Sequence, residues 1–329
     1  MQPASVNELS TIIKTLTRGV NGDKLACKFA VKSGGHSPFL GMNDIDGGIS
    51  VDLRNLNSTT IAADESYVSL STGSKWRDVY AVLDDTGITI PGAECSDTGV
   101  GGVILGGGIS FFFTRVGFVA DNVLAYEVVL ASGDIVNANG TDNSDLHMAL
   151  QGGLNNFGIV SRFDVAAFEN GKVWGGGITN PATGNNTAIF LKALSNLTDN
   201  NHKDPYAAYG TLFSYNTSTN ARVIVHTIVY TKDIEHPEIF QPFESITPQL
   251  ANSLRTTTVG DLTNESSAFM PVGYRDLDAT VAFKNSIAAI NLVHNITNGI
   301  YNKVSRFVLL AYYSRPEPPS TSTNTFGHL

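Results

Sequence analysis

Glycine is distributed unevenly along the chain, and this distribution restricts the folds that the first half can adopt. Of the 32 glycines, 22 lie before residue 160 and 10 lie after it. Glycine is needed where the backbone takes positive φ angles or where another backbone approaches closely. The sequence therefore predicts two unlike parts, at residues 1–166 and 167–315, followed by an irregular Pro/Ser/Thr-rich tail at 316–329.

The composition excludes several classes of protein. The 329 residues are 42% hydrophobic and 16% charged, which is typical of a globular chain of about two domains. The net charge of −9 argues against a nucleic-acid partner, because such a partner requires a basic face. No apolar run reaches about 18 residues, so we expect no membrane span. Cys27 and Cys95 make no metal-binding pattern, so we expect no metal site.

The spacing of apolar residues predicts helices and strands in both parts. Ser5 and Glu8 have the spacing of a capping box that starts a helix, and Ser144 is predicted to cap another. The first part is also predicted to contain strands at 29–31, 49–53, 67–73 and 158–168, a helix at 74–87 with Trp76, Val79, Tyr80 and Leu83 inward, and a hairpin at 123–136 turning at 132–134. The second part is predicted to contain a strand at 220–232, a helix at 286–304 and a strand at 306–315. An α+β fold follows.

The stretch KFAVKSGGHSPFLG, residues 28–41, places two glycines and a histidine directly after a predicted strand. Successive backbone N–H groups in such a turn can form a nest that binds phosphate oxygens without a cationic side chain. A second stretch, GVGGVILGGGIS at 99–110, lacks the third glycine of G-x-G-x-x-G and the lysine of a P-loop. Ordinary β-turns would explain either stretch alone, but His36 would project from a strand end toward whatever the nest holds.

These motifs, in this order, resemble the FAD-dependent oxidoreductases of the vanillyl-alcohol oxidase superfamily, whose FAD-binding domain is of the PCMH type. The berberine-bridge-enzyme-like branch is the most similar. The resemblance includes GVGGVILGGGISFFFTRVGFVADNV and NSDLHMALQGGLNNFGIVSRFDV, and it covers about residues 1–166. It implies an FAD-binding domain of two α+β subdomains, with its N-terminal strand region missing here. A substrate domain with an antiparallel sheet flanked by helices would follow.

The resemblance also implies where FAD would lie. Ser33, Gly34, Gly35 and Ser37 would surround the pyrophosphate, and His36 would carry a covalent bond to the 8α-methyl group of the flavin. The other implied contacts are Gly99, Gly101, Gly102, Gly106, Gly107 and Gly108 beside pyrophosphate and ring, Asp121, Asn122 and Val123 near the adenosine, and Gly152, Gly153, Asn156, Phe157, Gly158 and Ile159 in the closing turn.

Cys95 could form a second bond, to the flavin C6, because doubly tethered members of the family have a cysteine at this spacing before the G-V-G-G run. The alternative is a buried structural thiol, and the neighbouring Glu94 would raise the thiol pKa and slow thiolate attack. The chain departs from the family at Lys32, where arginine is frequent, and at His147 and Met148, where an aromatic pair is usual. It is also shorter at both ends.

The resemblance implies a reaction in which an alcohol or amine carbon of a small molecule donates a hydride to the flavin, whose electrons then reduce O₂ to hydrogen peroxide. A non-oxidative rearrangement over the flavin and an inactive truncated remnant are the alternatives. The catalytic base is not assigned: His226 and Tyr230 share one face of a predicted strand, but a structural role is favoured for each. We expect a monomer whose partners are the substrate and O₂.

The chain is dense in N-x-S/T sequons, which begin at Asn57, Asn139, Asn185, Asn196, Asn216, Asn264 and Asn295. Such sites predict a glycoprotein of the secretory pathway. The first residues, MQPASVNELS, do not resemble a secretory leader. We therefore expect a shortened version of an enzyme that is secreted in its full-length form.

Overall fold

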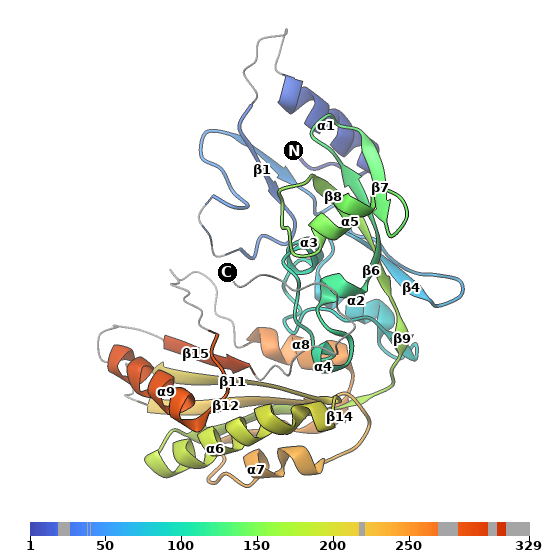
Figure 1. Cartoon of the computed structure of the whole chain (residues 1–329). Coiled ribbons are helices and arrows are strands. Elements are labelled where there is room, and N and C mark those ends of the chain that lie inside the picture. Colours follow the sequence, from blue (N-terminus) through green and yellow to red (C-terminus); the bar gives the residue numbers. More distant parts are fainter. Residues whose placement is uncertain are drawn as a thin grey trace. The chain divides into compact units, whose positions relative to one another are not determined.

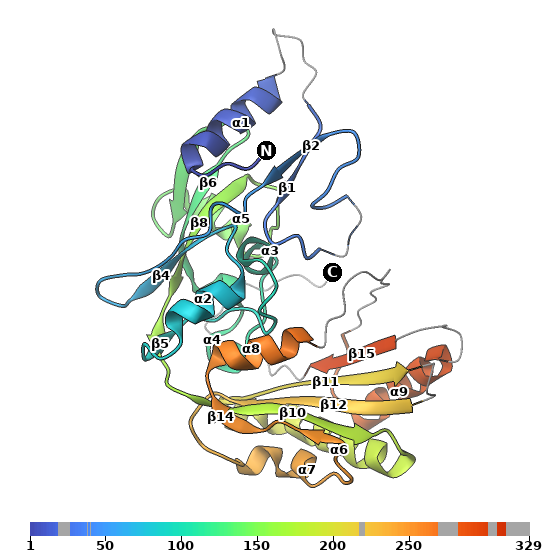
Figure 2. The same cartoon turned by 180° about the vertical axis from the view of Figure 1, so that it is seen from behind.

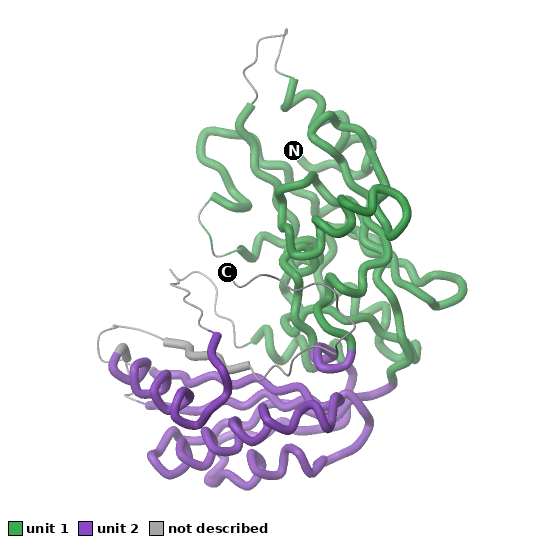
Figure 3. The backbone as a smooth tube through the Cα atoms, viewed as in Figure 1, with its two compact units in different colours: residues 1–110, 116–170, 259–271 green, residues 111–115, 171–258, 272–329 purple. Residues whose placement is uncertain are grey.

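The structure is a computed structural model that describes residues 1–18, 27–37, 39, 41–216, 221–268, 282–301 and 308–313 (Figure 1). The chain divides into two compact units, coloured separately in Figure 3. Unit 1 comprises Met1–Ser110, Val116–Asn170 and Val259–Pro271, and unit 2 comprises Phe111–Arg115, Gly171–Thr258 and Val272–Leu329. Each unit contains its own sheets and its own core.

The described strands of unit 1 form one antiparallel sheet of five strands and two short pairs. The sheet has the order β3–β4–β8–β6–β7, with bounds Thr59–Ile61, Tyr67–Ser71, Ile159–Ala166, Val123–Val129 and Ile135–Asn139. The pairs are parallel β1–β2 (Phe29–Lys32, Ile49–Asp52) and antiparallel β5–β9 (Ile88–Thr89, Phe168–Glu169). The predicted hairpin is confirmed: β6 pairs with β7, and Gly133 in the turn has a φ of 81°, which favours glycine.

The helices of unit 1 follow from the amphipathic patterns of their sequences. α1 (Val6–Arg18) begins as predicted, and the Ser5 hydroxyl accepts a hydrogen bond from the Glu8 N–H at 3.2 Å. The Glu8 carboxylate accepts from the Ala4 N–H at 2.8 Å. α2 (Trp76–Leu83) buries all four residues that were predicted to face inward. The remaining helices of this unit are α3 (Val100–Leu105), η1 (Val119–Asn122), α5 (Ser144–Leu150) and α8 (Val259–Ala268).

In unit 2, the described strands form a six-stranded antiparallel sheet with the path β13–β10–β12–β11–β15, from which β14 branches by pairing with β10. The strands are β10 (Val173–Pro181), β11 (Ala207–Asn216), β12 (Ala221–Tyr230), β13 (Ala251–Asn252), β14 (Arg255–Thr257) and β15 (Val308–Tyr313). α6 (Gly184–Asn200), α7 (Gln241–Glu244) and α9 (Ile287–Tyr301) lie on one face of this sheet in both views (Figures 1 and 2). Residues of these helices and of the sheet share one core, which includes Trp174, Phe190, Phe213, Ile228, Phe243 and Ile290. Short elements complete the unit: α4 (Phe113–Val116), η2 (Asn201–Lys203) and η3 (Glu238–Phe240).

The division into units differs from the predicted boundary at residue 166. β9 pairs with β5, so the first unit extends to Asn170. The chain also passes between the units more than once, because 111–115 belong to unit 2 and α8 belongs to unit 1. α8 packs against α2, and the Gly260 N–H donates to the Asp84 carboxylate at 3.3 Å. Local apolar spacing does not report such long-range docking, which is why the sequence predicted a single crossing.

Several local predictions also differ from the structure. α5 begins at Ser144 as expected, but its N-cap is Asn143, in a left-handed conformation with φ 47° and without a side-chain capping bond. The Asn143 amide instead donates to the Asn137 carbonyl at 2.7 Å. β10, α6 and β11 were not predicted, and the tail at 316–329 lies outside the described residues. Among the helices that the structure describes, none has the length and apolar character needed to cross a bilayer.

Candidate functional site

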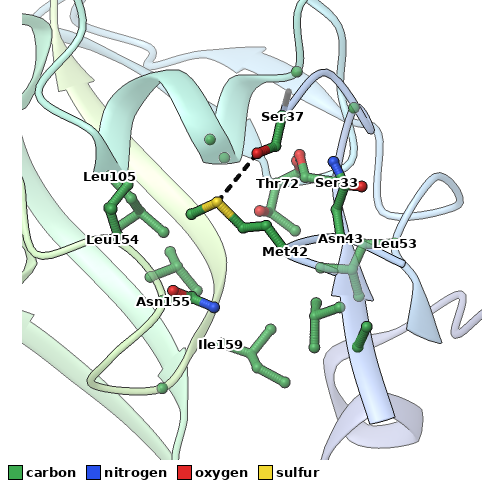
Figure 4. Close-up of a pocket in the computed structure, with 18 of the residues that line it drawn as sticks. Ser33, Ser37, Met42, Asn43, Leu53, Thr72, Leu105, Leu154, Asn155 and Ile159 are labelled. Carbon is green, nitrogen blue, oxygen red and sulfur yellow. Dashed lines mark hydrogen bonds between the residues drawn. The ribbon is translucent and has the colours of Figure 1, made fainter. Parts of the chain in front are cut away.

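Unit 1 contains a cavity of about 810 Å³ whose lining comes from α1, β1 and the loop that follows it, α3, and the segment around the start of β8 (Figure 4). Part of its wall is apolar and includes Ile13, Phe29, Leu53, Val129 and Ile159. Ser33, Thr72 and Asn43 contribute polar groups to the lining and lie on the same side of the pocket in Figure 4. The cavity therefore offers an apolar region and a polar region within one unit, as ligand pockets usually do.

The polar wall is built where two glycine segments meet. A Cβ on Gly34 would lie 2.5 Å from the Cα of Gly99, and a Cβ on Gly99 would lie 2.6 Å from the Cα of Gly34. Real Cβ atoms do not approach backbone this closely, so both positions require glycine. The Ser33 hydroxyl donates to the Thr72 carbonyl at 2.5 Å and fixes the start of the loop. The strand end after β1 and the start of α3 are thereby held side by side.

Several backbone N–H groups in this wall have no protein acceptor. Within the part of the chain that the structure describes, the N–H groups of Gly34, Gly35, His36, Gly101 and Gly102 donate to no protein atom. All five residues line the cavity. Backbone donors in folded proteins are almost always paired with protein, water or ligand. The wall is therefore a cluster of hydrogen-bond donors suited to an anionic ligand.

The wall also has room for a ligand at a glycine. A Cβ on Gly102 would meet no atom within 4 Å, so this glycine leaves open space at the cavity surface. Apart from His36, no ionisable side chain occurs among the described lining residues.

The ammonium group of Lys32 lies behind the loop, because a Cβ on Gly35 would lie 2.6 Å from the Lys32 Cε and 3.5 Å from its Nζ. The absence of a Cβ on Gly35 permits this close packing, and its φ of 69° separately favours glycine.

The cavity brings together many of the residues singled out in the sequence. Those that line it are Ser33, Gly34, Gly35, His36, Ser37, Gly99, Gly101, Gly102, Asn156, Phe157, Gly158 and Ile159. Those that are not part of its lining are Cys95, Gly106, Gly107, Gly108, Asp121, Asn122, Val123, Gly152 and Gly153. Sequence reasoning missed several polar lining residues, namely Asn43, Thr72, Thr98 and Asn155. Asn155 lies within the quoted NSDLHMALQGGLNNFGIVSRFDV stretch, next to Asn156, but was not singled out. Asn43, Thr72 and Thr98 belong to no quoted motif, and only the fold brings them to the cavity.

The second glycine run stabilises the turn between α3 and η1. The carbonyls of Gly107 and Gly108 accept hydrogen bonds from Ala120 and Val119 at 2.9 and 3.0 Å. The Asp121 carboxylate accepts from the Phe118 N–H at 2.9 Å, and its pKa is raised mainly by burial. The Asn122 amide donates to the carbonyls of Val116 and Phe118. These residues organise the chain beyond α3, whichever ligand the cavity holds.

Cys95 lies in a different environment from the cavity wall. It is a free, partly buried thiol, and Cys27 is free as well. Burial raises the pKa of the Cys95 thiol, and Glu94 and Asp97 raise it further, whereas a hydrogen bond with Ser267 of α8 opposes them. The thiolate is therefore disfavoured in the structure as it stands. This agrees with the expected effect of Glu94 and leaves the second flavin bond untested.

His226 lies in the core of unit 2, fully buried and packed against Phe190 and Phe243. Its Nδ1 lies 2.7 Å from the Tyr209 hydroxyl, and its Nε2 lies 3.1 Å from Oδ1 of Asn180. The Asn180 amide nitrogen donates to two carbonyls, so Oδ1 is the acceptor and His226 Nε2 the donor. Burial lowers the pKa of His226 to about 3. These bonds assign it a structural role within unit 2.

Tyr230 also has a defined structural partner. Its hydroxyl donates to the Asp204 carboxylate at 3.1 and 3.2 Å, and burial together with that carboxylate raises the pKa of Tyr230 to about 12. Both candidates therefore make hydrogen bonds that stabilise unit 2 internally. In the described ranges, no group of three His, Cys, Asp or Glu residues could hold a metal ion.

Comparison with known proteins places this chain among flavin-binding relatives. The model of the FAD binding domain family matches residues 1–139. The FAD-dependent monooxygenase CTB5 of Cercospora nicotianae is 34% identical over 332 residues, which cover 96% of this chain and 71% of that protein. Other curated relatives are matched over 60% and 54% of their length, so the chain spans about half to two thirds of several of them.

Solved structures share the fold at lower identity. The 6-hydroxy-D-nicotine oxidase of Arthrobacter nicotinovorans is 21% identical with a TM-score of 0.72, covering 83% of this chain and 59% of that one. The glucooligosaccharide oxidase of Acremonium strictum, which carries a 6-S-cysteinyl, 8α-N1-histidyl FAD, is also 21% identical with a TM-score of 0.66, covering 83% and 56%. At this identity the likeness is one of fold.

Proposed function

Because this chain belongs to the FAD-linked oxidoreductases that have a PCMH-type FAD-binding domain, within the vanillyl-alcohol oxidase superfamily, we propose that its unit 1 cavity binds FAD and that it oxidises a small molecule. One observation carries the proposal: a wall of backbone N–H groups that donate to no described protein atom, built where glycine segments meet, lines a cavity of sufficient size. A pyrophosphate is the part of FAD that such a wall suits.

The residues present fit the cofactor. The N–H groups of the Gly34–His36 loop and of Gly101 and Gly102 would donate to the pyrophosphate oxygens. Lys32, behind Gly35, adds a positive charge close to the loop. The apolar wall at Ile13, Phe29 and Val129 would take the flat adenine ring.

When bound, the flavin would supply the redox chemistry that the proposed oxidation of an alcohol or amine carbon by O₂ requires. The protein contributes binding, orientation and exclusion of water. We call the polar wall with the N–H groups of Gly34–His36, Gly101 and Gly102 the donor wall. His36 is exposed at its end, where the imidazole is accessible for attachment to the flavin. No described residue is assigned as the proton acceptor, because His226 and Tyr230 already serve unit 2 internally.

His36→Ala is expected to convert tethered flavin into dissociable flavin. Wild-type protein denatured in acid should retain yellow colour above a filter, whereas the variant should release it, because the proposed bond to the 8α-methyl group is absent. The donor wall remains, so native variant protein should still bind added FAD. His202→Ala, at an exposed histidine of unit 2, is the matched control. Wild-type flavin that passes the filter after denaturation would refute the tether.

The fate of oxygen tests the proposed oxidase reaction. The relative CTB5 is named a monooxygenase, whereas the structural neighbours are named oxidases. We propose the oxidase outcome, in which one hydrogen peroxide forms per substrate oxidised and no atom of O₂ enters the product. Turnover under ¹⁸O₂, with peroxide assay and product mass spectrometry over alcohols and amines, separates the two. Label in the product with no peroxide would support a monooxygenase instead. Flavin that is never bleached during turnover would indicate a non-oxidative reaction.

A further inference from the structure

Five described residues in the lining of the unit 1 cavity carry a hydroxyl group, namely Thr17, Ser33, Ser37, Thr72 and Thr98. A hydroxyl donates one hydrogen bond and can also accept. A hydroxyl whose hydrogen is already donated within the protein can offer a ligand only an acceptor oxygen. The hydrogen bonds that these five groups make inside the protein therefore show which of them can still act as a donor.

Four of the five hydroxyl groups already donate to protein atoms. The acceptors are three carbonyl oxygens and one sulfur, at 2.5 to 3.1 Å: Ser33 donates to Thr72, Thr17 to Ile13, Thr98 to Cys95 and Ser37 to Met42. Figure 4 draws the bond between Ser37 and Met42 as a dashed line. The resemblance to the family implied that Ser33 and Ser37 surround the pyrophosphate, but their hydroxyls cannot donate to it without breaking these bonds.

Thr72, which directly follows β4, is the exception. Its N–H donates to the Ser161 carbonyl at 3.0 Å and its own carbonyl accepts from Ser33, but its Oγ1 has no hydrogen-bond partner among the residues that the structure describes. The residue is only 3% exposed. Its Oγ1 is not one of the fully buried side-chain atoms that lack a partner, so this oxygen remains open to the cavity. Because a hydroxyl in such a place costs free energy without an acceptor, a partner from the cavity would be favourable.

The Thr72 hydroxyl lies beside the donor wall. A Cβ on Gly101 would lie 2.6 Å from Thr72 Oγ1 and 3.0 Å from Ser33 Oγ, so a glycine here leaves the space that both hydroxyls occupy. Thr72 and Ser33 also lie on the same side of the pocket in Figure 4. The two backbone hydrogen bonds of Thr72 fix its position at this side. The free hydroxyl and the N–H groups of Gly101 and Gly102 therefore belong to one wall of the cavity.

We infer that the Thr72 hydroxyl donates a hydrogen bond to a phosphate oxygen of the FAD pyrophosphate, an inference that rests on the proposed function. Its place beside Gly101, and not among the apolar residues such as Ile13 and Phe29, favours a phosphate over the adenine ring. No carboxylate in the described lining competes for the hydroxyl hydrogen. A hydrogen bond to an ionised oxygen is also stronger than one to a neutral acceptor. The donor wall would thus combine backbone donors with one donor that depends on a threonine side chain.

Thr72→Val tests this assignment, because valine has nearly the shape of threonine and lacks the hydroxyl. Binding is measured by titrating FAD into apoprotein in the His36→Ala background, where flavin is dissociable. The dissociation constant should rise by about tenfold or more, the effect expected when a hydrogen bond to a charged group is lost. Thr72→Ser keeps the hydroxyl and should retain most of the affinity. Thr60→Val, the same replacement at an exposed position on β3 of the same unit, is the matched control and should bind FAD as the background does.

Two further measurements distinguish a phosphate donor from a structural role. The unfolding free energy of the apoprotein should not fall in Thr72→Val, because the hydroxyl has no partner to lose in the part of the chain that the structure describes. The ³¹P resonances of bound FAD should shift in Thr72→Val but not in Thr60→Val. Unchanged FAD affinity in Thr72→Val, a loss of affinity matched by a loss of apoprotein stability, or unchanged ³¹P resonances would overturn the inference. If the His36→Ala background itself bound no FAD, the proposed function would be refuted instead.

Discussion

Gly34→Ala is expected to abolish flavin retention and to destabilise the chain. The added Cβ would lie 2.5 Å from the Cα of Gly99, and backbone atoms on both sides cannot move without separating the β1 loop from α3. Overpacking of this kind costs on the order of 1–3 kcal/mol of unfolding free energy. Because the two segments carry the donor wall, its N–H groups would no longer converge. Purified protein should therefore be colourless, as measured by flavin absorbance per chain.

Gly102→Ala tests FAD binding at the same wall without the loss of stability expected for Gly34→Ala. Its Cβ meets no protein atom, so it would occupy only space proposed for FAD, while alanine within α3 should raise the unfolding free energy by up to about 1 kcal/mol. In the His36→Ala background, FAD affinity should fall by about tenfold or more. Gly140→Ala, at an open surface glycine of unit 1, should change neither quantity. Undiminished FAD binding by both the Gly34 and Gly102 variants would contradict the assigned cofactor site.

His226 is expected to make the stability of the chain fall steeply in acid. Its folded pKa of about 3 lies below the ordinary value of 6.5, so between these limits the unfolded chain binds a proton that the folded chain excludes. The unfolding free energy should therefore decrease as pH falls through this window, by about 1.4 kcal/mol per pH unit from this residue. Above pH 6.5 the residue is neutral in both states and contributes no slope.

His226→Phe isolates this contribution. At pH 7 the variant should be less stable by about 2–4 kcal/mol, since it leaves the buried Oδ1 of Asn180 without its donor and removes a partner of Tyr209. At pH 4.5 the difference should shrink, because the variant has no imidazole to protonate. Urea unfolding at the two pH values measures this, with exposed His202→Gln as control. If the difference in unfolding free energy between wild type and variant were the same at both pH values, His226 would be protonated as readily in the folded state as in the unfolded state.

Much of unit 1 could be predicted from the sequence because its signals are local. The glycines at 35 and 133 take positive φ angles, and the apolar spacing of α2 correctly identified its buried face. The Ser33–Ser37 motif, with the later glycine runs, also identified the family, which relatives then confirmed. These features depend on residues close together in the chain, so the local backbone geometry and side-chain periodicity can be read directly from the sequence.

Only the tertiary structure determined the surroundings of the polar residues that the sequence singled out in unit 2. Strand alternation placed His226 and Tyr230 on one face, but only the packing of α6 and α7 shows that this face is a closed core. The return of α8 to unit 1 likewise joins segments far apart in sequence. Periodicity shows which residues share a face of a helix or strand. The burial and charge environment of those residues depend on what covers that face, and contacts between distant segments determine this cover.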